Sequence, residues 1–299
     1  MDRTRTLTSA SILVVVSILT GCARPEKIVV GSKNFTEQLV LGEILAQQIE
    51  RKAGVQVERR LNLGGTMLAQ QALVAGAIDL YPEYTGTALT AILKLPPEKD
   101  PGAVFKRVHD EYVKRYQLEW LTPFGFNNTF AMVVRKADVG AGTLSAAAAS
   151  GKLWRMGVGY EFFQRPDGYQ GLVRAYRLKT TGTPVTMDLG LLYTALGGGQ
   201  VDMVAGNSTD GVLSVIDGVT LTDDRKYFPP YQCATVVRRE TLARYPQLSG
   251  VLQELSGSLS EGKMQRLNYQ VDGEHRPLRD VAADFLVELD KQGSTLRHQ

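Results

Sequence analysis

The sequence has few of the residues from which catalytic and metal sites are usually built. It contains two cysteines and three histidines in 299 residues, and the histidines belong to no recognisable constellation. The sequence motifs of zinc peptidases, serine hydrolases, P-loop proteins and dinucleotide-binding proteins are absent from it. Since it shows no nucleophile–base pair and no Cys/His spacing suited to zinc, we expect no enzyme, no metal site and no cofactor.

Neither sign of charge dominates the chain. The 34 Lys and Arg residues against 31 Asp and Glu give a formal net charge of +3, without a basic run, so nucleic acid is not an expected partner. Hydrophobic residues make up 43% and charged residues 22%, which is typical of a soluble globular protein. A chain of this length can form two lobes with separate cores.

Long apolar runs are missing, and the one notable apolar segment lies near the N-terminus. Residues 12–19 follow Arg3 and Arg5 and are too few to span a bilayer. The sequence Leu-Thr-Gly-Cys at residues 19–22 resembles a bacterial lipobox. This order predicts a lipoprotein signal peptide over residues 1–21 and lipid attachment at Cys22. The alternative is a buried apolar N-terminal helix.

These features predict a protein of the periplasm or the outer face of the cell membrane, anchored through Cys22. With Cys22 lipidated, Cys233 has no partner for a disulfide. Cys233 lies in an apolar, strand-like segment, and we interpret it as a small buried hydrophobic residue.

Strand-like and helix-like segments alternate along the rest of the chain. We predict strands at residues 27–30, 56–61, 78–80, 157–160, 185–187 and 201–205. Helices are expected at residues 37–52, capped by Thr36, and at 66–75, 167–176 and 189–196, with three more near 240–256, 260–271 and 278–290. Such alternation predicts an α/β fold with mostly parallel sheets.

A short internal match indicates two similar lobes. The pattern Ala-Leu-x-x-Gly-x-Ile/Val-Asp occurs at residues 72–79 and again at 195–202, an offset of 195 − 72 = 123. Chance, or the shared pattern of helix-to-strand turns, is the alternative explanation. On the two-lobe interpretation, Tyr84 and Asn207 are equivalent and face a shared cleft at the carboxyl ends of the strands.

Two apolar strands flank the middle of the chain and predict where it crosses between the lobes. They cover residues 129–134 and 234–237. The first lobe is then discontinuous, with residues 26–128 and 233–299, and the second lobe covers residues 129–232.

Aromatic residues gather near the predicted strand ends. They are Tyr81, Tyr84, Phe130, Tyr160, Phe162, Phe163, Tyr169, Tyr227, Phe228 and Tyr231. Each of them alone would favour a place in the core. Several rings that converge on one cleft would instead suit an organic cation, because a quaternary ammonium has no N–H group and is attracted to ring faces. A carboxylate on the same ligand would need Lys, Arg, Thr or backbone donors.

Seven segments resemble, in the same order, the glycine betaine/choline/carnitine-type binding proteins of osmoprotectant ABC importers. They are GSKNFTEQ (31–38), DLYPEYTGTALT (79–90), GFNNTFA (125–131), FFQRPDGYQGL (162–172), NSTDG (207–211), DDRKYFPPY (223–231) and LNYQVDG (267–273). The resemblance implies a two-lobed, type II-like periplasmic-binding-protein fold that closes on solute like a hinge. It also implies a separate ABC permease and its ATPase as partners. We expect a monomer without catalytic activity; an envelope enzyme on a related two-lobed scaffold is the alternative.

The resemblance also assigns residues to a ligand site. Tyr84 and Tyr231 match tyrosines of an aromatic cage, and Thr87 matches a carboxylate-binding threonine. Lys33 and Arg165 match basic positions that hold a carboxylate, with a surface or interlobe salt bridge as the alternative.

Two positions depart from the family's cage. Phe130 and Asn207 stand where well-studied members carry tyrosine. Weakening one ring contact and losing another costs about 1–3 kcal/mol of binding free energy. From the resemblance we expect a quaternary-amine osmoprotectant as the ligand. Because of Phe130 and Asn207, the alternative is an amino acid or an ergothioneine-like zwitterion that uses Asn207 and Asn128.

Overall fold

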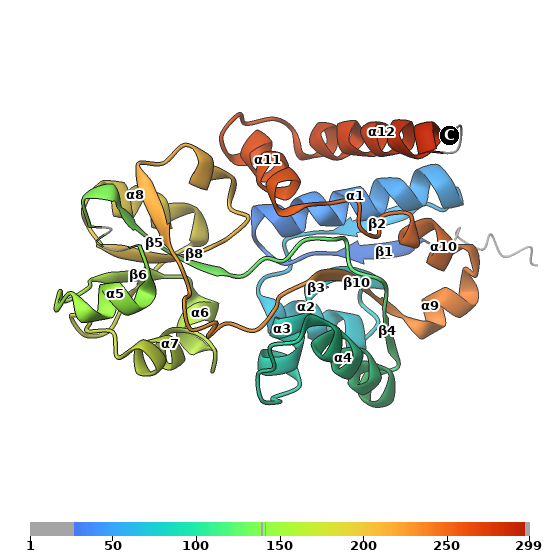
Figure 1. Ribbon diagram of the computed structural model, residues 1–299. Helices are drawn as coiled ribbons and strands as arrows, with labels where there is room; N and C mark the ends of the chain where they lie inside the picture. The colour runs from blue at the N-terminus through green and yellow to red at the C-terminus, as the bar shows by residue number, and fades with distance from the viewer. Residues whose placement is uncertain (1–26, 139, 141, 297–299) are drawn as a thin grey trace, which may run out of the picture.

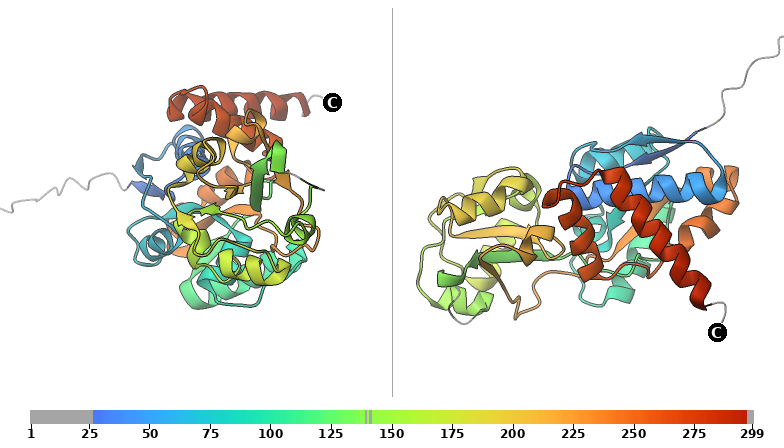
Figure 2. Two further views of the ribbon diagram at one scale, coloured as in Figure 1. Left: turned by 90° about the vertical axis from the view of Figure 1, so that its left-hand side faces the viewer. Right: turned by 90° about the horizontal axis from the view of Figure 1, so that it is seen from above.

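Two mixed sheets, each flanked by helices, form two lobes that lie side by side (Figures 1 and 2). The computed structural model describes residues 27–138, 140 and 142–296, so the predicted signal peptide and Cys22 lie outside the described residues. The chain passes from one lobe to the other ahead of β5 (Phe130–Arg135) and returns ahead of β10 (Cys233–Arg238). The predicted two-lobed α/β fold is confirmed.

The first sheet has the strand order β2-β1-β3-β10-β4. Its other strands are β1 (Ile28–Gly31), β2 (Val57–Arg60), β3 (Leu80–Tyr84) and β4 (Leu118–Trp120). Its helices are α1 (Thr36–Ala53), α2 (Thr66–Val74), α3 (Thr85–Thr87), the π-helix η1 (Ala88–Ile92), α4 (Pro101–Tyr116), α9 (Arg239–Arg244), α10 (Gln247–Gln253), α11 (Glu261–Asp272) and α12 (Leu278–Leu296).

The second sheet has the order β7-β6-β8-β5-β9. Its other strands are β6 (Met156–Val158), β7 (Val185–Thr186), β8 (Met203–Asn207) and β9 (Gly218–Leu221). The helices are α5 (Leu144–Ala149), α6 (Tyr160–Gln164), α7 (Tyr169–Tyr176) and α8 (Leu192–Gly197), with short 3-10 turns η2 (Lys136–Asp138), η3 (Leu189–Leu191) and η4 (Gly211–Ser214).

Each sheet is mixed, whereas the sequence suggested mostly parallel sheets. Strand β1 pairs in parallel with β2 and β3, and β6 pairs in parallel with β7 and β8. The strands that follow the crossings, β10 and β5, run antiparallel to both of their neighbours. The antiparallel pairing arises because each of these strands enters its sheet from the other lobe.

The predicted equivalence of the lobes is visible in the strand register. Tyr84 is the last residue of β3 and lies opposite Cys233, while Asn207 is the last residue of β8 and lies opposite Phe130. The two Asp residues of the internal repeat also match. Asp79 accepts a hydrogen bond from the backbone of Val29, and Asp202 accepts one from the backbone of Arg155. Strand ends from both lobes therefore lead to the same cleft.

Helix α1 is buried on nearly all sides. Its apolar residues pack into the core, and α12 lies along it on the outside (Figure 1). Two glutamines of α1 form hydrogen bonds to neighbouring helices. Gln47 donates to the backbone carbonyl of Arg279 in α12, and Gln48 donates to that of Val251 in α10. These contacts hold α1 in place, and the residues of its N-terminal turn, Thr36 and Glu37, line the cleft.

Several predicted boundaries need correction. Thr36 does not cap α1: the N-cap is Phe35, and the Thr36 hydroxyl donates instead to Asp272. The strand predicted at 78–80 lies at β3, later in the chain, and the helix predicted near 240–256 is divided into α9 and α10 around Pro246. Strands β4 and β9, of three and four residues, were not predicted.

Within the described part of the chain, no helix is both long enough and apolar enough to cross a membrane.

Candidate ligand-binding cleft

A cleft of about 870 Å³ lies between the lobes and is lined by side chains from both. All eight residues predicted to bind ligand line it. They are Lys33, Tyr84, Thr87, Asn128, Phe130, Arg165, Asn207 and Tyr231. The structure therefore brings together residues that are up to 198 positions apart (231 − 33).

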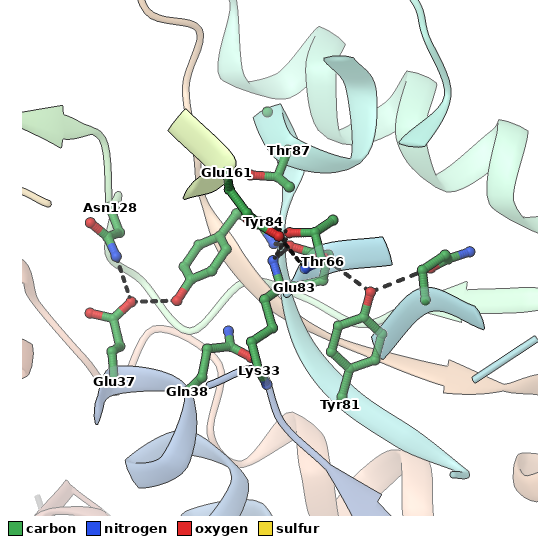
Figure 3. A network of polar contacts seen from close by, with 12 residues as sticks. Lys33, Glu37, Gln38, Thr66, Tyr81, Glu83, Tyr84, Thr87, Asn128 and Glu161 are labelled. Atoms are coloured by element: carbon green, nitrogen blue, oxygen red, sulfur yellow. Dashed lines mark hydrogen bonds and ion pairs between the residues drawn. The ribbon is translucent and has the colours of Figure 1, made fainter. Parts of the chain in front are cut away.

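Lys33 lies in the loop after β1 and is buried by its partners (Figure 3). Its Nζ donates to Glu83 Oε1 at 2.6 Å and to Thr66 Oγ1 at 2.9 Å. The same nitrogen lies 5.1 Å from the centroid of the Tyr84 ring. The proposed carboxylate-binding lysine is thus already neutralised by a buried acid of its own lobe.

Arg165 of the second lobe reaches across the cleft. Its Nη1 donates to Thr87 Oγ1 at 2.9 Å, and its Nε and Nη2 make two hydrogen bonds to the Asp167 carboxylate. Although burial opposes ionisation of both groups, Arg165 holds the pKa of Asp167 below its usual value. Asp167 accepts two further bonds, from Thr90 and from the Tyr231 hydroxyl at 2.6 Å. Arg165 therefore forms its ion pair with Asp167 of its own lobe, and not across the lobes. Its contact across the lobes is the hydrogen bond to Thr87.

Aromatic rings form a group on one wall of the cleft. The Phe130 ring lies edge-on to Phe162 at 4.7 Å and to Tyr231 at 5.6 Å between centroids, and Phe228 lies beside it at 5.5 Å. The Arg165 guanidinium lies 5.3 Å from the Phe130 centroid and 5.6 Å from that of Tyr231. Ring faces of this kind can attract a cation.

A glycine allows the Tyr231 ring to reach this position. A Cβ atom on Gly86 would lie 2.6 Å from Tyr231 Cδ1 and 2.7 Å from the Pro230 carbonyl oxygen, so a side chain there would displace the ring. Gly86 belongs to helix α3, directly after Tyr84 and Thr85. The EYTGT and FPPY segments are thus in direct contact.

Glu37 is a cleft residue that the sequence analysis did not single out. Its Oε1 accepts hydrogen bonds from the Tyr84 hydroxyl at 2.7 Å and from Asn128 Nδ2 at 2.8 Å (Figure 3), and Oε2 accepts one from Asn268 Nδ2 at 3.3 Å. Burial raises the pKa of Glu37, and these hydrogen bonds offset only part of the effect. This carboxylate lies at the hydroxyl end of Tyr84, and no ion pair joins it to a basic group among the described residues.

Asn207 is held in place by Asp210. The backbone N–H of Asn207 donates to Asp210 Oδ2 at 2.9 Å, and its side-chain Nδ2 donates to Oδ1 at 3.3 Å. The Tyr193 hydroxyl also donates to Asp210, at 2.6 Å, and both residues line the cleft. Burial raises the pKa of Asp210. Tyr193 therefore brings a ring to the wall where Asn207 lacks one.

Besides Glu37, sequence reasoning missed several polar residues of the cleft region, and five of them make hydrogen bonds to other residues there. They are Thr66, Glu161, Asp167, Asp210 and Asn268. Four of them lie in or beside the segments that carried the family resemblance. Two of these contacts could not be inferred from local sequence, because Glu161 accepts from Thr66 across the lobes and Asn268 donates to Glu37 across 231 residues.

The two lobes, the shared cleft and the rings and charges that line it define a solute-binding protein. Residues 26–288 match the family described as the substrate binding domain of ABC-type glycine betaine transport systems. The chain belongs to this family. It is therefore a substrate-binding protein of an ABC importer, which acts outside the cytoplasm together with an ABC permease.

Three relatives show how far the similarity extends. The glycine-betaine-binding protein of Pseudomonas aeruginosa is 35% identical, over 90% of this chain and 89% of its own length. The ergothioneine transport permease/ergothioneine binding protein of Helicobacter pylori is 34% identical over 88% of this chain, which spans only 47% of that longer protein. A crystal structure of a glycine betaine/carnitine/choline ABC transporter has 31% sequence identity and a TM-score of 0.74, covering 88% of this chain and 98% of the other.

Proposed function

We propose that this protein captures a quaternary-amine osmoprotectant, similar to glycine betaine or choline, and delivers it to an ABC permease and its ATPase. One observation carries the proposal: Tyr84, Phe130 and Tyr231 line one cleft together with Thr87 and Arg165. Ring faces suit a methylated ammonium group, and an Arg–Thr pair suits a carboxylate. Both halves of a small betaine thus have partners.

In the proposed bound state, a ligand carboxylate accepts hydrogen bonds from Lys33 or Arg165, which donate to Glu83 and Asp167 in this structure. Arg165 has donors directed at Thr87 and Asp167, and Lys33 has donors directed at Thr66 and Glu83. A ligand carboxylate near Thr87 would replace the hydroxyl as the acceptor for Arg165 Nη1. The methylated ammonium would then lie against the Phe130 and Tyr231 rings, on the faces beside the guanidinium.

The proposal includes the organisation of the chain. We assign residues 26–128 and 233–299 to the first lobe and residues 129–232 to the second, because each range contains the strands of one sheet. We also propose a monomer, with a lipid anchor at Cys22 after removal of residues 1–21. Replacing Cys22 with Ser would then release the protein from membranes and abolish labelling by radioactive palmitate in cells.

A second candidate ligand is an ergothioneine-like zwitterion. The observation in its favour is Asn207, which places an amide where a ring was expected, held by Asp210 at the cleft wall. The relative from Helicobacter pylori, whose name specifies ergothioneine, has a similar level of identity to the glycine-betaine-binding relative. An amino acid is the remaining small zwitterion that these polar groups would suit.

A thermal-shift screen of residues 23–299 tests the proposed function. The panel contains glycine betaine, choline, carnitine, proline betaine, ergothioneine and common amino acids. A ligand at a hundredfold excess over its Kd stabilises the folded state by about 2.7 kcal/mol. We expect a shift with a quaternary amine. A shift with ergothioneine alone would favour the second candidate, and no shift with any of the panel at millimolar concentration would refute both.

Substitutions then locate the site. Tyr84→Ala and Tyr231→Ala are expected to abolish the shift, whereas Phe105→Ala, which removes a ring on α4 away from the cleft, keeps it. Unchanged binding in both tyrosine variants would remove these rings from the site.

A further inference from the structure

Glu37 holds two amide side chains in a single orientation. Asn128 Nδ2 donates to Oε1 and Asn268 Nδ2 donates to Oε2, and the latter nitrogen also donates to the Thr209 carbonyl at 2.9 Å. Because the amide nitrogens face Glu37, the two amide oxygens must face elsewhere. Neither Oδ1 atom has a hydrogen-bond donor among the described residues.

These two oxygens are buried, although both residues contribute other atoms to the cleft lining. Asn128 is 8% exposed and Asn268 is 2% exposed, and both residues line the cleft. Buried acceptors in native proteins are nearly always paired, so two unpaired oxygens on either side of one carboxylate need an explanation. A group with N–H or O–H donors that enters the cleft with the solute would pair them.

The charge of the cleft favours a cation for this role. Five acids line the cleft without an ion pair among the described residues: Glu37, Glu161, Asp188, Asp210 and Asp272. The two basic residues that line it, Lys33 and Arg165, are each paired with an acid, Glu83 and Asp167. The formal charge of the lining is therefore negative, and a net-neutral betaine does not balance it.

The Tyr84 side chain connects this region to the aromatic wall. Lys33 Nζ lies over the Tyr84 ring, and the Tyr84 hydroxyl donates a hydrogen bond to Glu37. Glu37 therefore lies at the hydroxyl end of the ring. Clefts of about 300–1,000 Å³ hold ligands of drug size, and this cleft of about 870 Å³ is near the upper end. A solute that fills it would extend beyond one methylated ammonium and one carboxylate.

We propose that Glu37, Asn128 and Asn268 form an acceptor site, which binds a second cationic group of the solute that carries N–H donors. This inference rests on the proposed function and names the class of solute more closely: a methylated ammonium compound with an additional ammonium, guanidinium or imidazolium group. The charged group pairs with Glu37, and its N–H donors supply the two amide oxygens.

Two probes that differ only in one ammonium group test the acceptor site on the unmodified protein. They are Nα-trimethyl-lysine and Nα-trimethyl-norleucine, compared by isothermal titration calorimetry, with glycine betaine, choline and carnitine measured alongside. A buried charge-assisted hydrogen bond corresponds to about tenfold or more in affinity, so we expect trimethyl-lysine to bind at least that much more tightly.

Variants then assign the difference to the acceptor site. Glu37→Gln and Asn268→Leu are expected to reduce the advantage of trimethyl-lysine to below about threefold and to leave the Kd of trimethyl-norleucine within the same factor. Asp217→Asn, which removes an equally charged group that is 85% exposed and outside the cleft, keeps the full advantage. Circular dichroism and thermal melting confirm that each variant is folded.

The possible failures can be told apart. Equal affinities of the two probes for the unmodified protein would overturn the acceptor site while leaving the proposed function intact. An advantage that persists in both variants would place the second cation elsewhere and overturn the assignment. If neither probe nor any of the three osmoprotectants binds, the proposed function itself fails.

Discussion

Glu161 of the second lobe caps a helix of the first lobe through Thr66. Its carboxylate accepts hydrogen bonds from the backbone amide and from the hydroxyl of Thr66, the first residue of α2 (Figure 3). Helix α2 has no acid in its first turn, and its N-cap is Gly65, where any Cβ would collide with the Glu161 carboxylate. A negative charge at a helix N-terminus is favourable, and here it is supplied only when the lobes meet. The contact between the lobes therefore includes stabilisation that the ligand does not provide.

Replacing Glu161 with Gln is expected to weaken ligand retention. The neutral amide keeps the shape but loses the charge, so the closed state is destabilised relative to the open one. A charge-assisted hydrogen bond contributes about 1.5–3 kcal/mol, and we expect the dissociation rate to rise about tenfold or more. The association rate should change little, because it depends on the open form. Stopped-flow fluorescence with the ligand from the thermal-shift screen measures both rates.

Asp217→Asn is the matched control for Glu161→Gln, because Asp217 is exposed, pairs with Lys136 of its own lobe and does not line the cleft. An unchanged dissociation rate in Glu161→Gln would show that the contact with Thr66 does not contribute to closure. A fall in the association rate alone would point instead to attraction of the ligand by the charge.

The pair of Arg165 and Asp167 leads to a prediction about ligands with a carboxylate. Asp167→Asn leaves a buried guanidinium without its acid, which costs about 3–5 kcal/mol of folding stability when no ligand is bound. A ligand carboxylate beside Thr87 would compensate part of this loss. In thermal melting, glycine betaine is expected to stabilise the variant by more than it stabilises the unmodified protein, and choline, which has no carboxylate, is not.

Asp202→Asn provides the comparison for Asp167→Asn. Asp202 pairs with Arg135 and Arg155 away from the cleft, so this variant should be less stable but should respond to both ligands as the unmodified protein does. If choline and glycine betaine shift Asp167→Asn equally, no ligand carboxylate reaches Arg165.

The order of the elements and the location of the cleft were predictable from the sequence. Alternating apolar segments gave most strands and helices to within a few residues, and the offset of 123 correctly matched Tyr84 with Asn207 at two strand ends. These features depend on local periodicity and on the rule that ligands bind at the carboxyl ends of parallel strands. The aromatic residues were noted from their positions near those ends, whereas the assignment of Lys33 and Arg165 to the site came from the resemblance to the family.

The electrostatic partners within the cleft were not predictable in the same way. Glu83 pairs with Lys33 across 50 residues, and Glu37 accepts from Asn268 across 231 residues. Local sequence patterns contain no information about such contacts, because they depend on how the lobes and the C-terminal helices pack together. Thr36 is an example: its local sequence favours a helix cap, but its hydroxyl donates a hydrogen bond to Asp272 of α11.

Asn207 tests how much the aromatic cage depends on a missing ring. Asn207→Tyr places a ring opposite Phe130, at the end of β8. One added cation–π contact contributes about 0.5–2 kcal/mol, so affinity for glycine betaine or choline should rise about 2- to 30-fold in titration calorimetry. Asn207→Leu is the control, since it removes the amide without adding a ring and should not increase affinity. Loss of all binding in both variants would instead give the Asn207 amide a direct role in recognition.

Glu37 predicts an unusual dependence on pH. Burial raises the pKa of Glu37 above its usual value, despite hydrogen bonds from Tyr84, Asn128 and Asn268. As the pH falls through this raised pKa, Glu37 takes up a proton and loses its attraction for a cation. Affinity for Nα-trimethyl-lysine is therefore expected to fall at a pH above the ordinary carboxyl range of about 4.5, while affinity for Nα-trimethyl-norleucine changes much less.

The stability of the ligand-free protein should respond to Glu37 in the opposite direction. Between the unfolded and the raised folded pKa, the folded state binds more protons through Glu37 than the unfolded state does. Acidification through this range therefore adds stability from this group, and the addition is complete below the unfolded pKa. Other acids with raised pKa values, Asp210 and Asp272, act in the same direction, so the quantity to compare is the difference between the unmodified protein and Glu37→Gln. Denaturant melts from pH 7 to pH 4 are expected to show the stability of the unmodified protein rising relative to that of the variant as its affinity for trimethyl-lysine falls. A parallel loss of both quantities would mean that acid acts by general unfolding, and that Glu37 is not the titrating group.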